Sequence, residues 1–156
     1  MSKKPPLDIE VEANCLGFKV RRAARAISTR YSEALQPHGL TNPQFSLLSV
    51  MATAGLRSLS EIARVSTTDR TTLTRNLGLL EREGLVESST GRDKRTRRFV
   101  LSPRGRKVHA AARKDWLLVQ EDMYKELGKA RFERVHADLD TLLAKLAKRE
   151  TKKTPD

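Results

Sequence analysis

The chain has 156 residues, a length that suits one folding unit, or a small domain extended by helical arms, with a core that needs no disulfide bonds. Hydrophobic residues make up 38% of the sequence, aromatic residues 4% and charged residues 32%, which is a poor composition for an enzyme with a deep apolar pocket. The formal net charge of +12 favours a polyanionic partner, nucleic acid ahead of an anionic membrane.

Targeting segments and metal sites find no support in the sequence. No run approaches 18 consecutive apolar residues, and Met1–Pro6 lacks the apolar stretch of a signal peptide, so we expect a cytoplasmic protein with no membrane partner. A single cysteine, Cys15, excludes an intrachain disulfide. Because Cys15 and the three histidines show no metal-ligand spacing, we expect neither a metal nor a cofactor.

Three helices are predicted in the first half of the chain. Apolar residues at three- and four-residue steps mark one helical face from about Ile9 to Leu35. A capping residue followed by proline at positions 41–43 opens a second helix, which ends near Gly55. Ser58 opens a short third helix, and residues 66–68 form the turn after it.

The second half predicts a fourth helix, a hairpin and two more helices. Leucines spaced by four and three residues give the helix from Asp69 to Gly84 its buried side. Residues 85–88 and 97–101 are short β-prone runs on either side of a polar tip, which is the pattern of a β-hairpin. A further helix starts at Ser102, and a last amphipathic helix carries apolar residues from Phe132 to Leu146.

The short third helix and the helix after it have the arrangement of a helix-turn-helix, whose second helix can enter the major groove of DNA. The exposed side of that second helix is rich in hydroxyl and guanidinium groups, which can reach base edges. The candidate DNA-reading residues are Arg70, Thr71, Thr72, Thr74 and Arg75. The alternative is an ordinary solvated helix start, because threonine and arginine are common on exposed helices.

The tip and second strand of the hairpin hold five cations and one acid within seven residues. Positive charges at such a density repel one another unless anions are near. Beside a helix-turn-helix it predicts a wing that binds phosphates or places an arginine in the minor groove. The residues concerned are Arg92, Asp93, Lys94, Arg95, Arg97 and Arg98.

Three segments resemble the MarR family of winged helix-turn-helix transcription regulators: LTNPQFSLLSVMA, SLSEIARVSTTDRTTLTRNLGLLEREGLVE and GRDKRTRRFVLSPRGRK. The resemblance spans about Leu16 to Leu146 and implies a non-catalytic homodimer that binds a pseudo-palindromic operator in double-stranded DNA. The implied fold is mainly α with a small β-hairpin wing, a winged helix-turn-helix plus a helical dimerisation region. We expect a single domain over 1–156, with the winged helix-turn-helix at about 41–103 and dimerisation helices at about 9–36 and 104–150.

The resemblance also implies roles for individual residues. Arg95 is similar to the family's minor-groove arginine, and Asp93 to the acid that orients it. The major-groove positions of the family fall on Arg70, Thr71, Thr72 and Arg75. Repression is the commoner mode of action in the family.

Members of the family respond to phenolic acids, other aromatic metabolites, acyl-CoA thioesters or peroxides. On the first helix, Phe18, Arg22 and Arg25 share a side that lies away from the apolar stripe. One aromatic ring and two arginines suit an anionic aromatic effector or its CoA thioester. The alternative places both arginines in water and packs Phe18 against a partner subunit.

Two other functions stay open, and an enzyme is the least supported class. Cys15 lies near the start of the first helix, where the peroxide-sensing branch of the family has a reactive cysteine, so a redox sensor is one alternative to an inert cysteine. The tyrosine pair that accompanies that cysteine is not evident. An architectural DNA-binding protein without an effector would use the same basic wing. The sequence shows no nucleophile with a base, metal cluster or phosphate-binding glycine loop.

Overall fold

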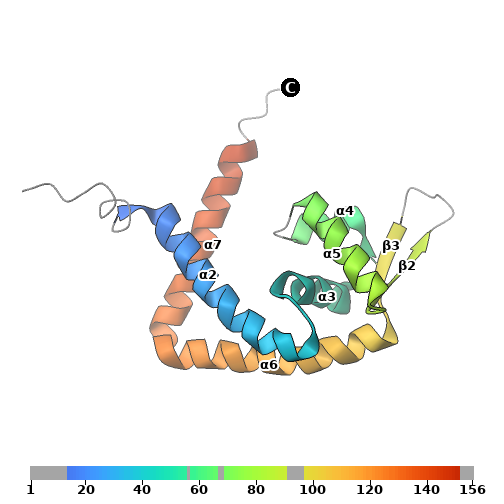
Figure 1. Cartoon of the computed structure of the whole chain (residues 1–156). Helices are drawn as coiled ribbons and strands as arrows, with labels where there is room; N and C mark the ends of the chain where they lie inside the picture. Colours follow the sequence, from blue (N-terminus) through green and yellow to red (C-terminus); the bar gives the residue numbers. More distant parts are fainter. Residues whose placement is uncertain (1–13, 56, 67–68, 91–96, 152–156) are drawn as a thin grey trace, which may run out of the picture. The chain divides into compact units, whose positions relative to one another are not determined.

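The computed structural model describes residues 14–55, 57–66, 69–90 and 97–151. In chain order the elements are α2 (Leu16–Leu35), η1 (Gln36–His38), α3 (Asn42–Ala54), β1 (Arg57–Ser58), α4 (Leu59–Val65), α5 (Arg70–Arg82), β2 (Val86–Thr90), β3 (Arg97–Leu101), α6 (Pro103–Leu127) and α7 (Lys129–Thr151). Figure 1 labels all of them except η1 and β1. The chain divides into two compact units, one ending at Trp116 and one beginning at Leu117. The expected single domain stays a prediction.

Local capping fixes where three helices of the first unit, α3, α4 and α5, begin. The Thr41 hydroxyl accepts from the backbone N–H of Gln44, whose side chain accepts from the Thr41 backbone N–H. Ser58 and Glu61 form the same reciprocal pair at the start of α4. The Asp69 carboxylate accepts a backbone N–H of the first turn of α5 at 2.9 Å. These bonds satisfy N–H groups that have no partner inside a helix, which confirms the predicted starts of α3, α4 and α5.

The wing is a three-stranded antiparallel sheet in the order β1-β3-β2. In the β2–β3 ladder, Val86 lies opposite Leu101 and Ser88 opposite Phe99. The two residues of β1 pair with the other edge of β3. The sequence predicted only the β2–β3 hairpin, because a two-residue strand is too short to show the alternation that marks a strand.

A leucine-rich core holds the helices and the sheet of the first unit together. Its fully buried large side chains come from α2, α3, α4 and α5: Leu35, Leu48, Met51, Ile62, Leu73, Leu77 and Leu80. Burying each such side chain stabilises the fold by about 1.5–3 kcal/mol. Because three of the seven belong to α5, that helix is fixed to the core along one side and exposes the other.

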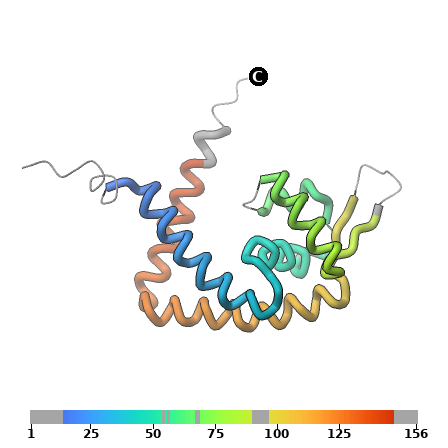
Figure 2. Tube along the Cα trace, viewed as in Figure 1, coloured from blue at the N-terminus to red at the C-terminus, as the bar shows by residue number. Residues whose placement is uncertain are grey.

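The junction between α5, β2 and α6 is tightly bonded. The Ser102 hydroxyl donates to the Gly84 carbonyl at 2.7 Å and accepts from the Gly105 backbone N–H at 2.8 Å, and the Ser102 N–H donates to the Leu85 carbonyl at 3.1 Å. Gly84 has a φ of 67°, a conformation that favours glycine. A Cβ on Gly105 would overlap the Leu85 carbonyl oxygen. In the trace of Figure 2, β3 leads directly through this junction into α6.

The second unit contains the end of α6 and all of α7. The Tyr124 and Phe132 rings meet edge to face at a centroid distance of 5.4 Å across the turn at Gly128. Four large apolar side chains of α7 are between 42% and 65% exposed: Val135, Leu139, Leu143 and Leu146. None of the helices in the described part of the chain combines the length and apolarity that crossing a bilayer requires.

Candidate nucleic-acid interface

Helix α5 presents a polar side to solvent. Leu73, Leu77 and Leu80 are buried, and the five predicted DNA-reading residues are all exposed: Arg70, Thr71, Thr72, Thr74 and Arg75. The structure therefore brings these five together on the first turns of one helix. Guanidinium and hydroxyl groups in this position match the donors and acceptors of base edges in the major groove.

The start of α5 is held by a carboxylate. Hydrogen bonds from the Thr72 side chain and backbone lower the pKa of Asp69 below its ordinary value, so the capping group is ionised at neutral pH. The Thr74 hydroxyl donates to the Arg70 carbonyl at 2.9 Å, so its hydrogen is used within the helix and its oxygen is left as an acceptor. The first turn thus has a fixed geometry before it meets any ligand.

The wing residues separate into two groups. Arg92, Asp93, Lys94 and Arg95, predicted at the wing tip, lie outside the described residues. Arg97, at the start of β3, is described, and its guanidinium makes three kinds of contact within the protein. Its Nη2 donates to both carboxylate oxygens of Glu81 at 2.7 and 2.8 Å, its Nε donates to the Ser88 hydroxyl at 3.0 Å, and its Cζ lies 5.2 Å from the centre of the Phe99 ring.

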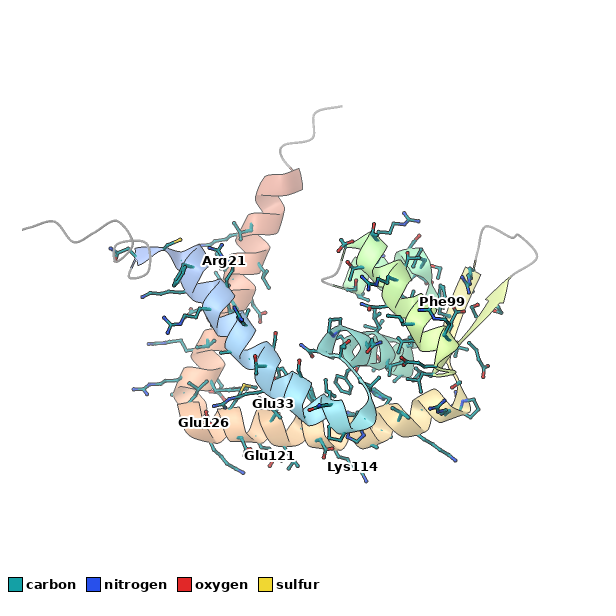
Figure 3. The ribbon with its side chains drawn as sticks, in the orientation of Figure 1. Arg21, Glu33, Phe99, Lys114, Glu121 and Glu126 are labelled. Carbon is teal, nitrogen blue, oxygen red and sulfur yellow. The ribbon has the colours of Figure 1, made fainter. Side chains whose placement is uncertain are left out.

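Arg98 and Phe99 occupy opposite faces of β3. Phe99, labelled in Figure 3, is buried beside α5. Arg98 is exposed and lies near Glu61, whose pKa is lowered first by hydrogen bonds from Ser58 and then by the nearby arginines. A cavity of about 400 Å³ is lined by residues of α5, β3 and the start of α4, among them Arg70, Thr74, Glu81 and Arg97.

The predicted effector residues are only partly brought together. Phe18 is half-buried and Arg22 and Arg25 are exposed on α2. A second cavity, of about 550 Å³, is lined by residues of α2, η1 and the segment after it: Arg25, Ser28, Thr29, Ser32, Glu33, Gln36, Gly39, Leu40 and Thr41. Arg25 therefore borders a cavity, whereas Phe18 and Arg22 are not among its lining residues.

Sequence analysis missed the hydroxyl side of this cavity. Ser28, Thr29, Ser32 and Gln36 follow Arg25 at offsets of 3, 4, 7 and 11, a helical spacing that places all five on one side of the first helix and its extension. This stripe is polar, and neither the apolar periodicity of the helix nor a cluster of charges marks it in the sequence.

Cys15 precedes α2 as its N-cap residue and is half-buried. Its side chain makes no capping hydrogen bond. Within the described ranges, no cluster of three or more histidine, cysteine, aspartate or glutamate side chains is arranged to hold a metal ion.

The sequence of the chain is similar to those of known DNA-binding regulators. The model of the MarR family matches residues 38–96, which include α3, α4, α5 and the start of the wing. The uncharacterized HTH-type transcriptional regulator YwoH of Bacillus subtilis (strain 168) is 30% identical over 105 residues, covering 67% of this chain and 77% of that protein.

Solved structures of similar proteins include complexes with DNA. The crystal structure of the M. tuberculosis transcriptional regulator MosR in complex with DNA has a TM-score of 0.76 and 39% identity, covering 87% of this chain and 99% of that chain. The transcriptional repressor CouR bound to a 23-mer DNA duplex has a TM-score of 0.74 and 26% identity, covering 92% and 99%. CouR bound to p-coumaroyl-CoA has a TM-score of 0.78 at 24% identity, covering 88% and 98%.

These similarities confirm the predicted fold class, mainly helical with a winged helix-turn-helix, and the prediction of a regulator and not an enzyme. The family match covers the helix-turn-helix itself, and the similarity to MosR extends over most of the chain. The chain therefore belongs to the MarR family and is a DNA-binding transcription regulator of the winged helix-turn-helix type.

Proposed function

We propose that the protein is a homodimeric repressor in which α5 of each subunit reads one half of a pseudo-palindromic operator. The observation that carries this proposal is the division of α5 into a leucine side within the core and an exposed side of arginines and threonines. One recognition helix covers only a few base pairs, so two-fold symmetry in the protein is matched by two half-sites about 10 base pairs apart. MosR and CouR, which share the fold, have both been solved bound to DNA, and this supports the DNA-binding part of the proposal.

The DNA contacts divide between the helix and the wing. Arg70 and Arg75, with the threonines between them, supply the contacts to base edges in the major groove. Arg92, Lys94 and Arg95 at the wing tip supply phosphate or minor-groove contacts, with Asp93 as the acid that orients Arg95.

The exposed apolar side of α7 supports a homodimer. Val135, Leu139, Leu143 and Leu146 recur at helical spacing and are all substantially exposed. A stripe of this size on a helix in water marks a surface that another protein surface covers. The second copy of the chain is the partner that two-fold operator recognition requires.

The effector of this proposal is an anionic aromatic metabolite or its CoA thioester. The cavity bordered by Arg25 offers one cation, one carboxylate at Glu33, the hydroxyls of Ser28, Thr29 and Ser32, and the apolar Leu40. Arg25 and the hydroxyls can bind a carboxylate or phosphate of a ligand whose ring lies on Leu40. CouR, which shares the fold, binds p-coumaroyl-CoA. The effector releases DNA if it prefers the DNA-free conformation, and a coupling of about 1–3 kcal/mol would lower operator affinity about 5- to 150-fold.

DNA binding is tested with fragments from upstream of the protein's own gene and its neighbours, against random DNA of equal length. Arg75→Ala should lose about 1–3 kcal/mol on the operator and much less on random DNA. Arg95→Ala should weaken both similarly and make the dependence on salt shallower. Equal losses on random DNA for the two variants would contradict these assignments.

The effector is tested on the same operator with metabolites that the neighbouring genes process. Arg25→Ala should bind the operator normally and respond poorly to the ligand. Arg21→Ala, an exposed arginine on α2 that does not line the cavity, is the matched control and should respond normally. A poor response of Arg22→Ala to the ligand would show that this second arginine, on the same side of α2 as Arg25, also contributes to effector binding.

Cys15→Ser separates ligand sensing from thiol sensing. Release of the wild type but not of Cys15→Ser by peroxide, with no response to any anionic metabolite, would replace the ligand proposal with a thiol sensor. Binding without preference for any sequence, and without response to either agent, would instead indicate an architectural protein.

A further inference from the structure

We propose that Glu81 and Arg97 form a clamp that fixes the wing relative to the recognition helix, so that Arg97 is a positioning residue for operator binding and not a phosphate contact. The clamp joins the last turns of α5 to the first residue of β3, sixteen positions later in the chain. This role deepens the proposed operator recognition and depends on it.

The first support is how the donors of Arg97 are used. An arginine has five N–H donors in a rigid fork. Nη2 of Arg97 is engaged by the two carboxylate oxygens of Glu81, and Nε by the hydroxyl of Ser88 on β2. These contacts bring one side chain of β3 into hydrogen bonds with both α5 and β2.

The second support is the environment of the pair. The Glu81 side chain is only 18% exposed, whereas that of Arg97 is 56% exposed. A carboxylate that has lost most of its hydrating water destabilises the fold unless a cation or hydrogen-bond donors compensate its charge. The Arg97 guanidinium also lies 5.2 Å from the centre of the Phe99 ring, which is itself buried, so the cation is held by a ring as well as by the carboxylate.

The third support is what the clamp connects. Helix α5 carries the residues proposed to read the major groove, and β2 and β3 lead to the wing tip. Both must reach their grooves of the same duplex at once, so a change in their relative position lowers the affinity of contacts that the clamp residues never touch.

Charge alone predicts the opposite effect, which makes the inference testable. Replacing Glu81 by glutamine removes a negative charge from a protein that binds a polyanion, so long-range electrostatics would strengthen DNA binding. Loss of the clamp would weaken it. Glu87→Gln makes the same change of charge at an exposed position on β2 and is the matched control.

The experiment is a double-mutant cycle in the full-length protein. It compares the affinities of the wild type, the two single variants and the double variant for operator and for random DNA across a salt series. Glu81→Gln and Arg97→Gln should each weaken operator binding about fivefold, and the double variant should be no weaker than either single variant. The slope of log affinity against log salt should stay that of the wild type. Arg97→Lys, which keeps the charge but cannot donate to Glu81 and Ser88 from two separate nitrogens, should also weaken operator binding, whereas Glu87→Gln should bind at least as well as the wild type.

The opposite pattern would overturn the clamp. In that pattern Arg97→Gln weakens operator and random DNA equally with a salt slope lower by about one, Arg97→Lys binds normally, and Glu81→Gln binds as well as the wild type or better. Amide hydrogen exchange of β2 and β3 without DNA gives a readout that does not depend on the operator. Faster exchange in Glu81→Gln and Arg97→Gln but not in Glu87→Gln supports the clamp even if the wild type binds no operator, and unchanged exchange in both contradicts it.

Discussion

Replacing glycine by alanine should change the stability of the fold in opposite directions at Gly105 in α6 and Gly78 in α5. Gly105→Ala should destabilise the fold by about 1–3 kcal/mol or more, because its Cβ would overlap the Leu85 carbonyl oxygen and separate α6 from β2. Gly78→Ala, inside α5, meets no atom within 4 Å and should stabilise the helix by about 0.5–1 kcal/mol. Urea unfolding of the two variants measures both effects. An equal effect on both would show that the junction is not closely packed.

His109 is a buried titratable side chain inside the DNA-binding unit. Its ring stacks on Phe45 at a centroid distance of 5.4 Å, and its Nε2 lies 3.0 Å from the Ser49 hydroxyl oxygen. Burial, and then the charge of Arg113, lower the pKa of His109 below 6.5.

This lowered pKa predicts a pH dependence of stability with a definite sign. Between the folded and unfolded pKa values, the unfolded chain binds the proton more tightly, so the free energy of unfolding should fall as pH falls below about 6.5. His109→Gln removes the titration and should flatten that part of the profile. Urea unfolding at several pH values measures the slope, and since the other two histidines remain in both proteins, identical slopes would refute the assignment.

At the residue scale, the density of cations in the wing predicts the partner of the surface but not the contacts of each side chain. The sequence pattern predicted the hairpin and grouped Arg97 with the cations of the tip, whereas the structure shows the Arg97 guanidinium in contact with Glu81. The Glu81 carboxylate that engages Arg97 lies sixteen residues earlier, on another element, and no local pattern connects the two. Arg25 was found by its charge, while the serines and threonine beside it became visible only as the wall of a cavity.

At the scale of single elements, the start of α5 depends on one side chain. Asp69→Ala removes the acceptor that orders the first turn, where Arg70, Thr71 and Thr72 lie, and should weaken operator binding severalfold. Asp69→Asn keeps an acceptor and removes the charge, so it should bind DNA nearly as well as the wild type or better. Fluorescence anisotropy with labelled operator distinguishes the two, and equal losses would mean that the charge matters and the cap does not.

Most helix starts were predictable because their causes are local. Thr41, Ser58 and Asp69 each cap a helix within three residues of their own position, so the sequence contains the whole motif. Strand β1 was not predictable, since its two residues are extended only because β3 offers them partners some forty positions later. The predicted start of the first helix, at about Ile9, falls on residues outside the described part of the chain.

At the scale of the whole molecule, the proposed dimer rests on α7. Truncation after Gly128 should abolish dimerisation and operator binding together. A subtler change, Leu143→Asp, introduces a charge into the apolar stripe and should raise the dimer dissociation constant. Thr141→Asp introduces the same charge on the other side of the helix and should leave the dimer dissociation constant unchanged. Sedimentation velocity at micromolar concentration measures both. A wild type that sediments as a stable monomer would exclude the proposed dimer.

The most direct test of operator recognition by two α5 helices is the dependence of affinity on half-site spacing. The wild type is titrated against the operator and against variants with about 5 or about 10 base pairs inserted between the half-sites, that is, half a turn or a full turn of the duplex. We expect two subunits per operator, and a large loss of affinity with the half-turn insertion, because one recognition helix would then face the wrong side of the DNA. One subunit per fragment, with an affinity that no insertion changes, would contradict the account.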